Sequence, residues 1–288
     1  MEQGEDLGEQ IIQNENSFDE VKSNNRKCRV LIGLIILSII LIILIIIILI
    51  KYKDEKQNEK QNEDNKNTNS THLYIQPSSG VHNFTIIFMP GLSNTPEDFK
   101  NLLTQRISIS KRNITKIIIL RSTKQNVSVY GGEKNYSWFD IYNFPMNSST
   151  SYNFEDLKNS SKILRNIIEE EANLLNKQYN KIIIGGHSQG AIISLYTAYN
   201  VEYMLGGVIS FCGFLPPQES VLPGKENLTV YYCFGDRDDV ITPSFYNETC
   251  KNIEQYKGFT KYIYPNQSHP ICDDEIKDSG NFLDTIMI

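Results

Sequence analysis

The segment from residue 181 to residue 193 constrains the fold more than any other part of this 288-residue chain. An isoleucine-rich strand ends at Gly185, and an apolar helix begins after Ser188. Between them lies the turn Gly-His-Ser-Gln-Gly, in which a Cβ on either flanking glycine would collide with the neighbouring strand or helix. A serine held on such a strained turn, at the start of a helix, is typical of a catalytic nucleophile. The pattern therefore predicts Ser188 as the nucleophile of an enzyme.

Short runs rich in isoleucine and valine recur through the rest of the same region. They lie at residues 84–89, 116–120, 181–185, 207–212, 228–234 and 259–264. Between them, residues 153–178 carry leucine and isoleucine at helical spacing, as expected of an amphipathic helix. Strands that alternate with helices form a mostly parallel sheet flanked by helices. Together with the serine turn, this predicts the α/β class and the α/β-hydrolase fold.

The chain divides into four segments of different composition. Residues 1–29 are polar and are predicted to be a disordered N-terminal tail. Residues 30–50 are nearly all isoleucine or leucine, and a helix of these 21 residues would be roughly 31 Å long, the thickness of a bilayer core. They are predicted to form a single transmembrane helix. Residues 51–72, rich in Lys, Glu, Gln and Asn, indicate a low-complexity stalk, and residues 73–288 are the predicted α/β-hydrolase domain.

A serine nucleophile needs a general base, which in this fold follows the nucleophile and the acid along the chain. The chain has four histidines. His72 and His82 precede Ser188, and His187 adjoins it on a tight turn where neighbouring side chains point apart. His269, in the loop after the strand at 259–264, is therefore the predicted base.

The acid that orients the base is expected at the end of the preceding strand. Residues 228–234 run into Gly235, after which Asp236, Asp238 and Asp239 offer three carboxylates. Asp238 is the predicted catalytic acid, because a turn of that length can reverse and aim the side chain at His269. Asp236 is the alternative, although it can instead hold the turn by bonding local backbone N–H groups.

Two backbone N–H groups are expected to form an oxyanion hole. One is that of Gln189, directly after the nucleophile, and the other comes from the loop after the strand at 84–89. Pro90 has no N–H, so Leu92 is the predicted second donor.

Several segments, in order, resemble the phospholipase/carboxylesterase family, which includes the acyl-protein thioesterases. They are residues 86–92, 137–141, 185–190, 194–198 and 235–238, followed by His269 and Cys272. The family usually has histidine where this chain has Pro90, and a second glycine where it has Ala191. Pro90 bears on the shape of the oxyanion loop, and neither departure removes a predicted triad residue.

The resemblance implies a serine hydrolase that cleaves long-chain acyl thioesters or carboxylic esters, such as S-palmitoyl cysteine or lysophospholipid, without a metal or cofactor. Its partners would be an acylated protein or lipid substrate and the membrane that holds its anchor. One alternative is a catalytically weak, membrane-tethered lipid-binding or interaction protein of the same fold, favoured by Pro90 alone. Another is a carboxylesterase for small soluble esters.

Aromatic residues crowd the segment 130–145, and Trp138 and Phe139 are the predicted substrate-binding residues. An alkyl chain gains about 0.8 kcal/mol for each buried CH₂, so an aromatic lining would bind a long acyl group well. The alternative is that these side chains only pack the domain. Nucleic acid is not an expected partner, because the net charge is -6 and no basic stripe with interleaved aromatics occurs.

Sequons for N-glycosylation are frequent after the apolar run and absent before it. Ten Asn-x-Ser/Thr triplets follow it, where composition alone would give about four. They begin at Asn69, Asn83, Asn113, Asn126, Asn135, Asn147, Asn159, Asn227, Asn247 and Asn266. The excess favours a lumenal or extracellular catalytic domain over a cytosolic one. The cysteines at 212, 233, 250 and 272 could form two disulfides, although the largely cytosolic family carries free cysteine at three of these positions.

Overall fold

The computed structural model describes Ile46 and residues 72–288. The predicted tail, transmembrane helix and stalk lie outside the described residues, apart from Ile46 and His72. Among the helices of the described part, none combines the length and the apolar character that crossing a bilayer requires.

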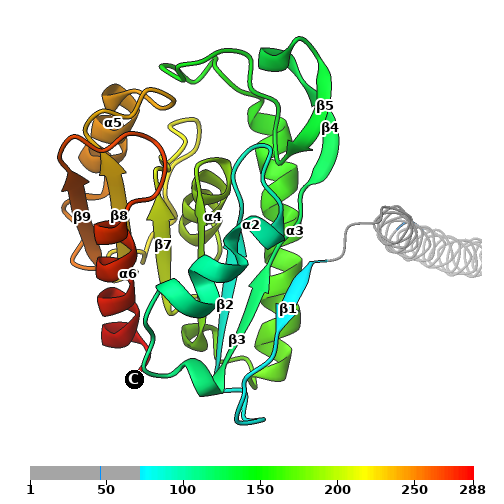
Figure 1. The fold of residues 1–288 in the computed structure, drawn as a ribbon, viewed down its shortest axis with the longest axis vertical. Helices are drawn as coiled ribbons and strands as arrows, with labels where there is room; N and C mark the ends of the chain where they lie inside the picture. Colours follow the sequence, from blue (N-terminus) through cyan, green and yellow to red (C-terminus); the bar gives the residue numbers. More distant parts are fainter. Residues whose placement is uncertain (1–45, 47–71) are drawn as a thin grey trace, which may run out of the picture. The chain divides into compact units, whose positions relative to one another are not determined.

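A seven-stranded sheet forms the centre of the described region (Figure 1). Its strand order is β1-β3-β2-β6-β7-β8-β9, and every neighbouring pair is parallel except β1 with β3. The strands are β1 Leu73–Ile75, β2 Phe84–Met89, β3 Thr115–Ile119, β6 Ile182–His187, β7 Gly207–Phe211, β8 Val230–Gly235 and β9 Phe259–Tyr264. The predicted mostly parallel sheet is therefore confirmed, with each of the six predicted runs forming a strand within two residues at either end.

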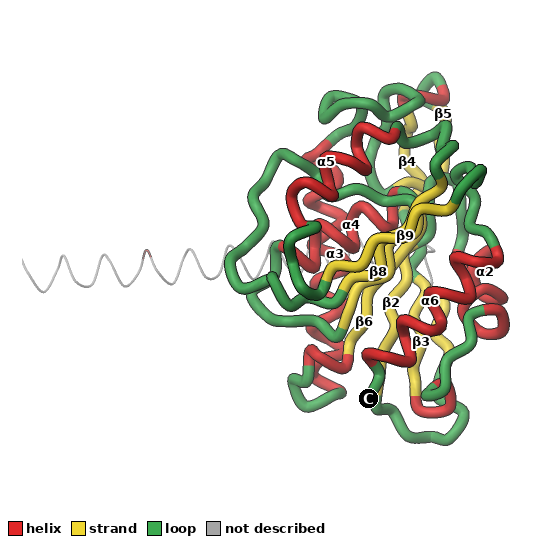
Figure 2. The backbone as a smooth tube through the Cα atoms, turned by 90° about the vertical axis from the view of Figure 1, so that its left-hand side faces the viewer, coloured by secondary structure: helices red, strands yellow, loops and turns green. Residues whose placement is uncertain are grey.

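Helices cover both faces of this sheet (Figure 2). They are α2 Pro96–Asn101, α3 Phe154–Leu174, α4 Gln189–Tyr199, α5 Pro243–Ile253 and α6 Asp273–Ile286. Helices α3, α4 and α5 bury their apolar sides in one core cluster, and α2 and α6 bury theirs in a second cluster on the other face. Short helical turns lie at Leu102–Arg106, Arg112–Ile114, Ser128–Tyr130 and Tyr179–Lys181.

The central strands supply both clusters because successive side chains of a strand point to opposite faces. In β2, Ile87 and Met89 belong to the first cluster, whereas Ile86 and Phe88 belong to the second. A strand buried on both faces has to be continuously apolar, which explains the isoleucine runs in the sequence.

The longest helix, α3, follows the predicted 153–178 segment but ends sooner. The Asn153 side chain caps its first turn by accepting from the N–H groups of Glu155 and Asp156. Asn176 and Lys177 then adopt positive φ angles of 54° and 61°, which an α-helix cannot accommodate.

An antiparallel hairpin, β4 Thr123–Val127 with β5 Glu133–Ser137, stands apart from the main sheet. Figure 1 shows it beyond the end toward which the strands β7 and β8 point. In a parallel sheet this carboxyl end is where active sites form.

Candidate active site

Ser188 sits at a strained turn between β6 and α4. Its backbone has φ 54° and ψ −119°, in a region that few non-glycine residues adopt. A Cβ on Gly186 would lie 2.5 Å from the carbonyl oxygen of Met89, and one on Gly190 would lie 1.9 Å from the same atom. Both distances are too short for any side chain, so the two glycines are what allow β2 to run beside this turn. The predicted need for glycine at both positions is confirmed.

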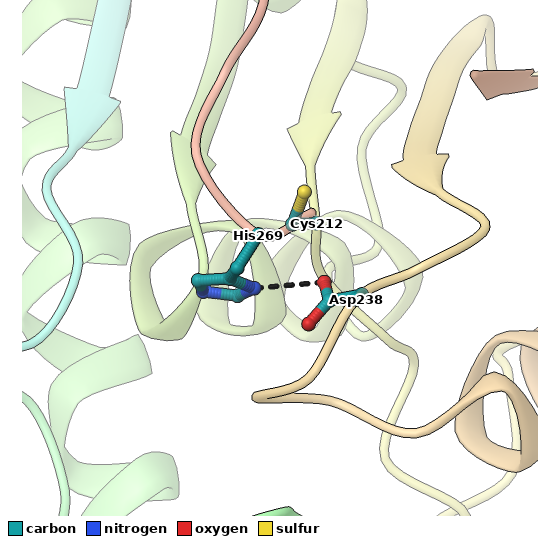
Figure 3. Close-up of side chains that lie close together, drawn as sticks. All are labelled: Cys212, Asp238 and His269. Carbon is teal, nitrogen blue, oxygen red and sulfur yellow. Dashed lines mark hydrogen bonds and ion pairs between the residues drawn. The ribbon is translucent and has the colours of Figure 1, made fainter. Parts of the chain in front are cut away.

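Asp238, which is buried, and His269, which is partly buried, form a hydrogen-bonded pair (Figure 3). The Nδ1–H of His269 donates to Oδ2 of Asp238 over 2.8 Å. The other carboxylate oxygen accepts from the N–H groups of Val240 and Ile241, both at 2.9 Å, and the Tyr246 hydroxyl donates to Oδ2. Burial opposes ionisation of Asp238, but these donors outweigh it and hold the pKa of its carboxyl below the usual value.

The alternative acid, Asp236, has a different position. Its side chain is exposed, and Oδ1 accepts the N–H of Asn266 at 2.7 Å. Asp236 therefore braces the loop that carries His269 and does not contact the imidazole. Of the carboxylates offered by this turn, Asp238 is the one that the structure pairs with His269.

The loop of His269 lies against the nucleophile turn. Nε2 of His187, the residue before Ser188, is 3.2 Å from the carbonyl oxygen of His269, and the two rings lie 5.0 Å apart. Within residues 72–288 no hydrogen bond joins the Ser188 hydroxyl to the His269 ring. Such contacts are often long in ligand-free enzymes and tighten when substrate binds.

The predicted oxyanion loop follows β2 directly. Leu92 is half-buried against the core, and its N–H donates no hydrogen bond within the described residues. Gln189 is the first residue of α4, so its N–H has no partner within the helix. The carbonyl of Pro90 accepts the indole N–H of Trp138 at 2.8 Å, so a proline at this position is compatible with an anchored loop.

Trp138 and Phe139, predicted to bind substrate, are buried in the core with exposed fractions of 4% and 0%. The Gln189 side chain fixes this segment, because Oε1 accepts the N–H of Trp138 at 3.0 Å and Nε2 donates to the Phe139 carbonyl at 2.8 Å. The observed contacts therefore match the packing alternative, and a contact with substrate stays a prediction.

Cys212 lies beside the acid–base pair, and its sulfur is within 4.8 Å of ligand atoms of Asp238 and His269 (Figure 3). These three residue types can bind zinc. However, the carboxylate of Asp238 already accepts four hydrogen bonds, and burial raises the pKa of the Cys212 thiol well above its usual value, so the thiol stays protonated. The arrangement suits a catalytic acid–base pair better than a metal site.

The possible disulfides are not formed among the described cysteines, all four of which are free. Cys212 and Cys250 belong to the core cluster on one face of the sheet, whereas Cys233 belongs to the cluster on the other. The sheet itself therefore separates Cys212 from Cys233.

Three features of the site have no counterpart in the sequence analysis: the Tyr246 donor, the Gln189 side-chain link and the His187 contact. Nothing in the sequence marks Tyr246 as a partner of the acid, because a tyrosine on an amphipathic helix usually packs the core. The other two flank Ser188, where the sequence motif specifies the backbone conformation and leaves the contacts of the side chains open.

A strained serine turn beside a buried Asp–His pair, at the carboxyl end of a mostly parallel sheet, defines a hydrolase of the α/β class. A family model described as phospholipase/carboxylesterase matches residues 70–287. The chain belongs to this phospholipase/carboxylesterase family, as its sequence resemblance indicated, and is a carboxylic ester or thioester hydrolase.

Curated relatives include acyl-protein thioesterases. Acyl-protein thioesterase 1 of Debaryomyces hansenii is 28% identical over 211 residues, which cover 70% of this chain and 90% of the relative. Acyl-protein thioesterase 1 homolog 1 of Dictyostelium discoideum is 34% identical over 174 residues, covering 58% of this chain and 74% of the relative. These similarities support a serine hydrolase of the thioesterase/esterase type.

Solved structures confirm the predicted α/β-hydrolase fold. Zea mays acyl-protein thioesterase 2 has a TM-score of 0.60 at 20% identity, covering 76% of this chain and 99% of that one. Arabidopsis thaliana SOBER1 has a TM-score of 0.62 at 18% identity, covering 71% of this chain and 99% of that one.

Proposed function

We propose that this enzyme cleaves long-chain acyl thioesters or carboxylic esters, of the palmitoyl-protein or lysophospholipid type, through an acyl-enzyme on Ser188. The observation that carries the proposal is the 2.8 Å hydrogen bond between His269 and Asp238 beside the strained serine turn. Because Asp238 holds Nδ1 of His269, Nε2 is the ring nitrogen that can take the proton of Ser188. The relatives named acyl-protein thioesterase support the acyl substrate class.

In this mechanism the Ser188 oxygen attacks the acyl carbonyl while His269 accepts its proton. The N–H groups of Leu92 and Gln189 stabilise the oxyanion, and losing one such donor typically raises the barrier by about 3–4 kcal/mol. His269 then gives its proton to the leaving thiol or alcohol. Water attacks the acyl-enzyme in the second half-reaction, with His269 again as base.

Fluorophosphonate labelling tests the nucleophile. The full-length chain is expected to be labelled, and Ser188→Ala to lose the label. Labelling retained in that variant would assign the nucleophile to another residue. Removing Ser188 or His269 should lower kcat by roughly 10⁴–10⁶, and a loss below about tenfold would favour the lipid-binding alternative. Turnover of a palmitoyl thioester, a lysophospholipid and a short soluble ester then separates the three substrate classes.

We also propose that residues 30–50 anchor the chain in a membrane, with the catalytic domain on the lumenal or extracellular side. The sequons support this side. Of the nine sequon asparagines in residues 72–288, eight are exposed and Asn135 is half-buried. The side-chain amide nitrogens of these nine make no hydrogen bond within the described structure, so attachment of a glycan would break none.

A peptide-N-glycosidase digest of the chain, expressed in eukaryotic cells, tests the proposed side. We expect the digested chain to migrate at a lower apparent mass on a denaturing gel, and the undigested chain to stay in the membrane after alkaline extraction. No shift would place the domain in the cytosol, and release by alkali would remove the anchor. Neither result depends on catalytic activity.

A further inference from the structure

His187, the residue before the nucleophile, contacts more of the catalytic machinery than its place in the sequence suggests. It ends β6, next to Ser188. Its ring lies 5.0 Å from the ring of His269 and 5.9 Å from that of Phe99 on α2. One imidazole therefore lies between the nucleophile turn, the base loop and the helix that follows the oxyanion loop.

The hydrogen bond of His187 defines its tautomer. Nε2 is 3.2 Å from the backbone carbonyl oxygen of His269, and a carbonyl can only accept. Nε2 therefore carries the hydrogen, and Nδ1 is a bare acceptor. Burial, together with the nearby His269, lowers the pKa of His187 to about 4, so the ring is neutral near pH 7.

The other ring nitrogen faces the oxyanion loop. A Cβ on Gly91 would lie 3.1 Å from Nδ1 of His187 and 3.3 Å from the His187 carbonyl oxygen. The backbone of the oxyanion loop therefore packs directly on this imidazole. Nδ1 is shielded from solvent and has no hydrogen-bond partner in the described part of the chain.

We propose that His187 is a positioning residue, which holds the His269 loop and the oxyanion loop in register with Ser188 through its Nε2–H bond and its packing on Gly91. This inference rests on the proposed function, because it matters for catalysis only if Ser188 and His269 react with substrate. His187 itself touches no reacting atom and exchanges no proton with substrate.

The unpartnered Nδ1 separates this role from plain packing. A buried acceptor without a donor is destabilising, so phenylalanine, which has a flat and somewhat larger ring without the nitrogens, should be tolerated by the fold. It would nevertheless lose the bond to the His269 carbonyl. Compared with phenylalanine, His187 should therefore lower the stability of the fold and raise the rate of catalysis. A residue that only packs the core would do the reverse.

Two substitutions in the full-length chain test the proposal. His187→Phe keeps the ring and removes the donor, whereas in His187→Gln the side-chain amide reaches nearly as far as Nε2 and can still donate. We expect His187→Phe to lower kcat and the rate of fluorophosphonate labelling about five- to tenfold, with KM changed less than about twofold and Tm unchanged or raised. His187→Gln should keep kcat within about threefold of wild type.

Hydrogen exchange supplies a readout that does not need activity. Backbone amides of residues 265–272 should exchange faster in His187→Phe than in the wild type or in His187→Gln. If wild type is not labelled by fluorophosphonate, the proposed function fails, and the exchange rates still decide whether His187 holds the loop.

Two results would overturn the positioning role. One is a His187→Phe variant with wild-type kcat and wild-type exchange in the His269 loop. The other is an equal loss of kcat in both variants together with a lower Tm, which would make the ring a packing element whose hydrogen bond is irrelevant.

Discussion

Lys116 donates to Glu171 over 2.5 Å at the amino-terminal end of the sheet, with both side chains almost completely buried. The second carboxylate oxygen of Glu171 accepts the Thr85 hydroxyl at 3.0 Å, so β2, β3 and α3 are joined at this point. Thr85 and its register partner Lys116 lie near the starts of β2 and β3, whereas Met89, whose carbonyl lies beside the Ser188 turn, is at the other end of β2. The pair of Lys116 with Glu171 is therefore expected to matter for stability and not for turnover.

Glu171→Ala should lower the free energy of unfolding by about 3–5 kcal/mol, because it leaves the Lys116 ammonium buried without its partner. Urea titration measures this loss, and kcat of the folded fraction should not change. Glu169→Ala is the matched control on the same helix, since the pair of Glu169 with Lys177 is exposed and should contribute less than about 1 kcal/mol. Equal losses in the two variants would contradict the prediction.

Tyr246→Phe should weaken catalysis without unfolding the protein. It removes one hydrogen-bond donor from the Asp238 carboxylate, the group that orients His269. This donor also helps to lower the pKa of Asp238. We expect kcat/KM to fall by about tenfold, since hydrogen bonds to charged groups are worth about 1.5–3 kcal/mol and three other donors remain. The acid limb of the pH–rate profile should move to higher pH, and an unchanged profile would show that the hydroxyl is dispensable.

Exchanging glycine and alanine at positions 190 and 191 should have different effects on the labelling of Ser188. Gly190→Ala places a Cβ 1.9 Å from the Met89 carbonyl, so β2 and α4 must separate and labelling of Ser188 should disappear. Ala191→Gly, one residue further along the helix, only removes a methyl group and should cost about 1 kcal/mol of stability with labelling retained. Labelling of Gly190→Ala at the wild-type rate would contradict the observed packing of the turn.

The stability of the protein should fall in acid through His187. Its pKa is about 4 in the folded state against 6.5 in the unfolded chain, so the unfolded state takes up the proton first as the pH falls. As the pH falls from 6.5 to about 4 this difference lowers the free energy of unfolding, and the loss reaches about 3 kcal/mol at pH 4.

Urea titrations of wild type and His187→Phe at pH 7.5 and pH 4 isolate that contribution. The difference between their unfolding free energies should shift by about 3 kcal/mol in favour of the variant at the lower pH. If the difference between the two proteins is the same at both pH values, the His187 ring takes up its proton in the folded protein as readily as in the unfolded chain.

The sequence predicted those parts of the fold in which apolar side chains are continuous. The runs at 84–89 and 259–264 form strands with the predicted boundaries. The hairpin β4–β5 went unpredicted because its strands, Thr-Lys-Gln-Asn-Val and Glu-Lys-Asn-Tyr-Ser, are polar and mostly exposed, so no buried face marks them. Strand β1 has only three residues, too few to show a period.

For the site, chain order and turn length identified His269 and Asp238 as partners, because a short turn at the end of a strand has few ways to aim its carboxylates. The burial of Trp138 and Phe139 could not be predicted, since an aromatic cluster lines a cavity or fills a core with the same residues. The Gln189 side chain holds the backbone of these two residues in the observed position, through hydrogen bonds that depend on the tertiary fold.

The hydrogen bonds of Gln189 also limit where this enzyme can change its substrate preference. The Gln189 amide fastens residues 137–139 to the first turn of the helix behind Ser188, so a substitution in that loop also disturbs the position of Ser188. New substrate preferences are therefore easier to acquire in segments without such a tie. Exposed positions on either side of Met146, whose backbone bonds Val240 and Thr242 beside Asp238, are one place where natural or laboratory variants can change selectivity while leaving the reaction intact.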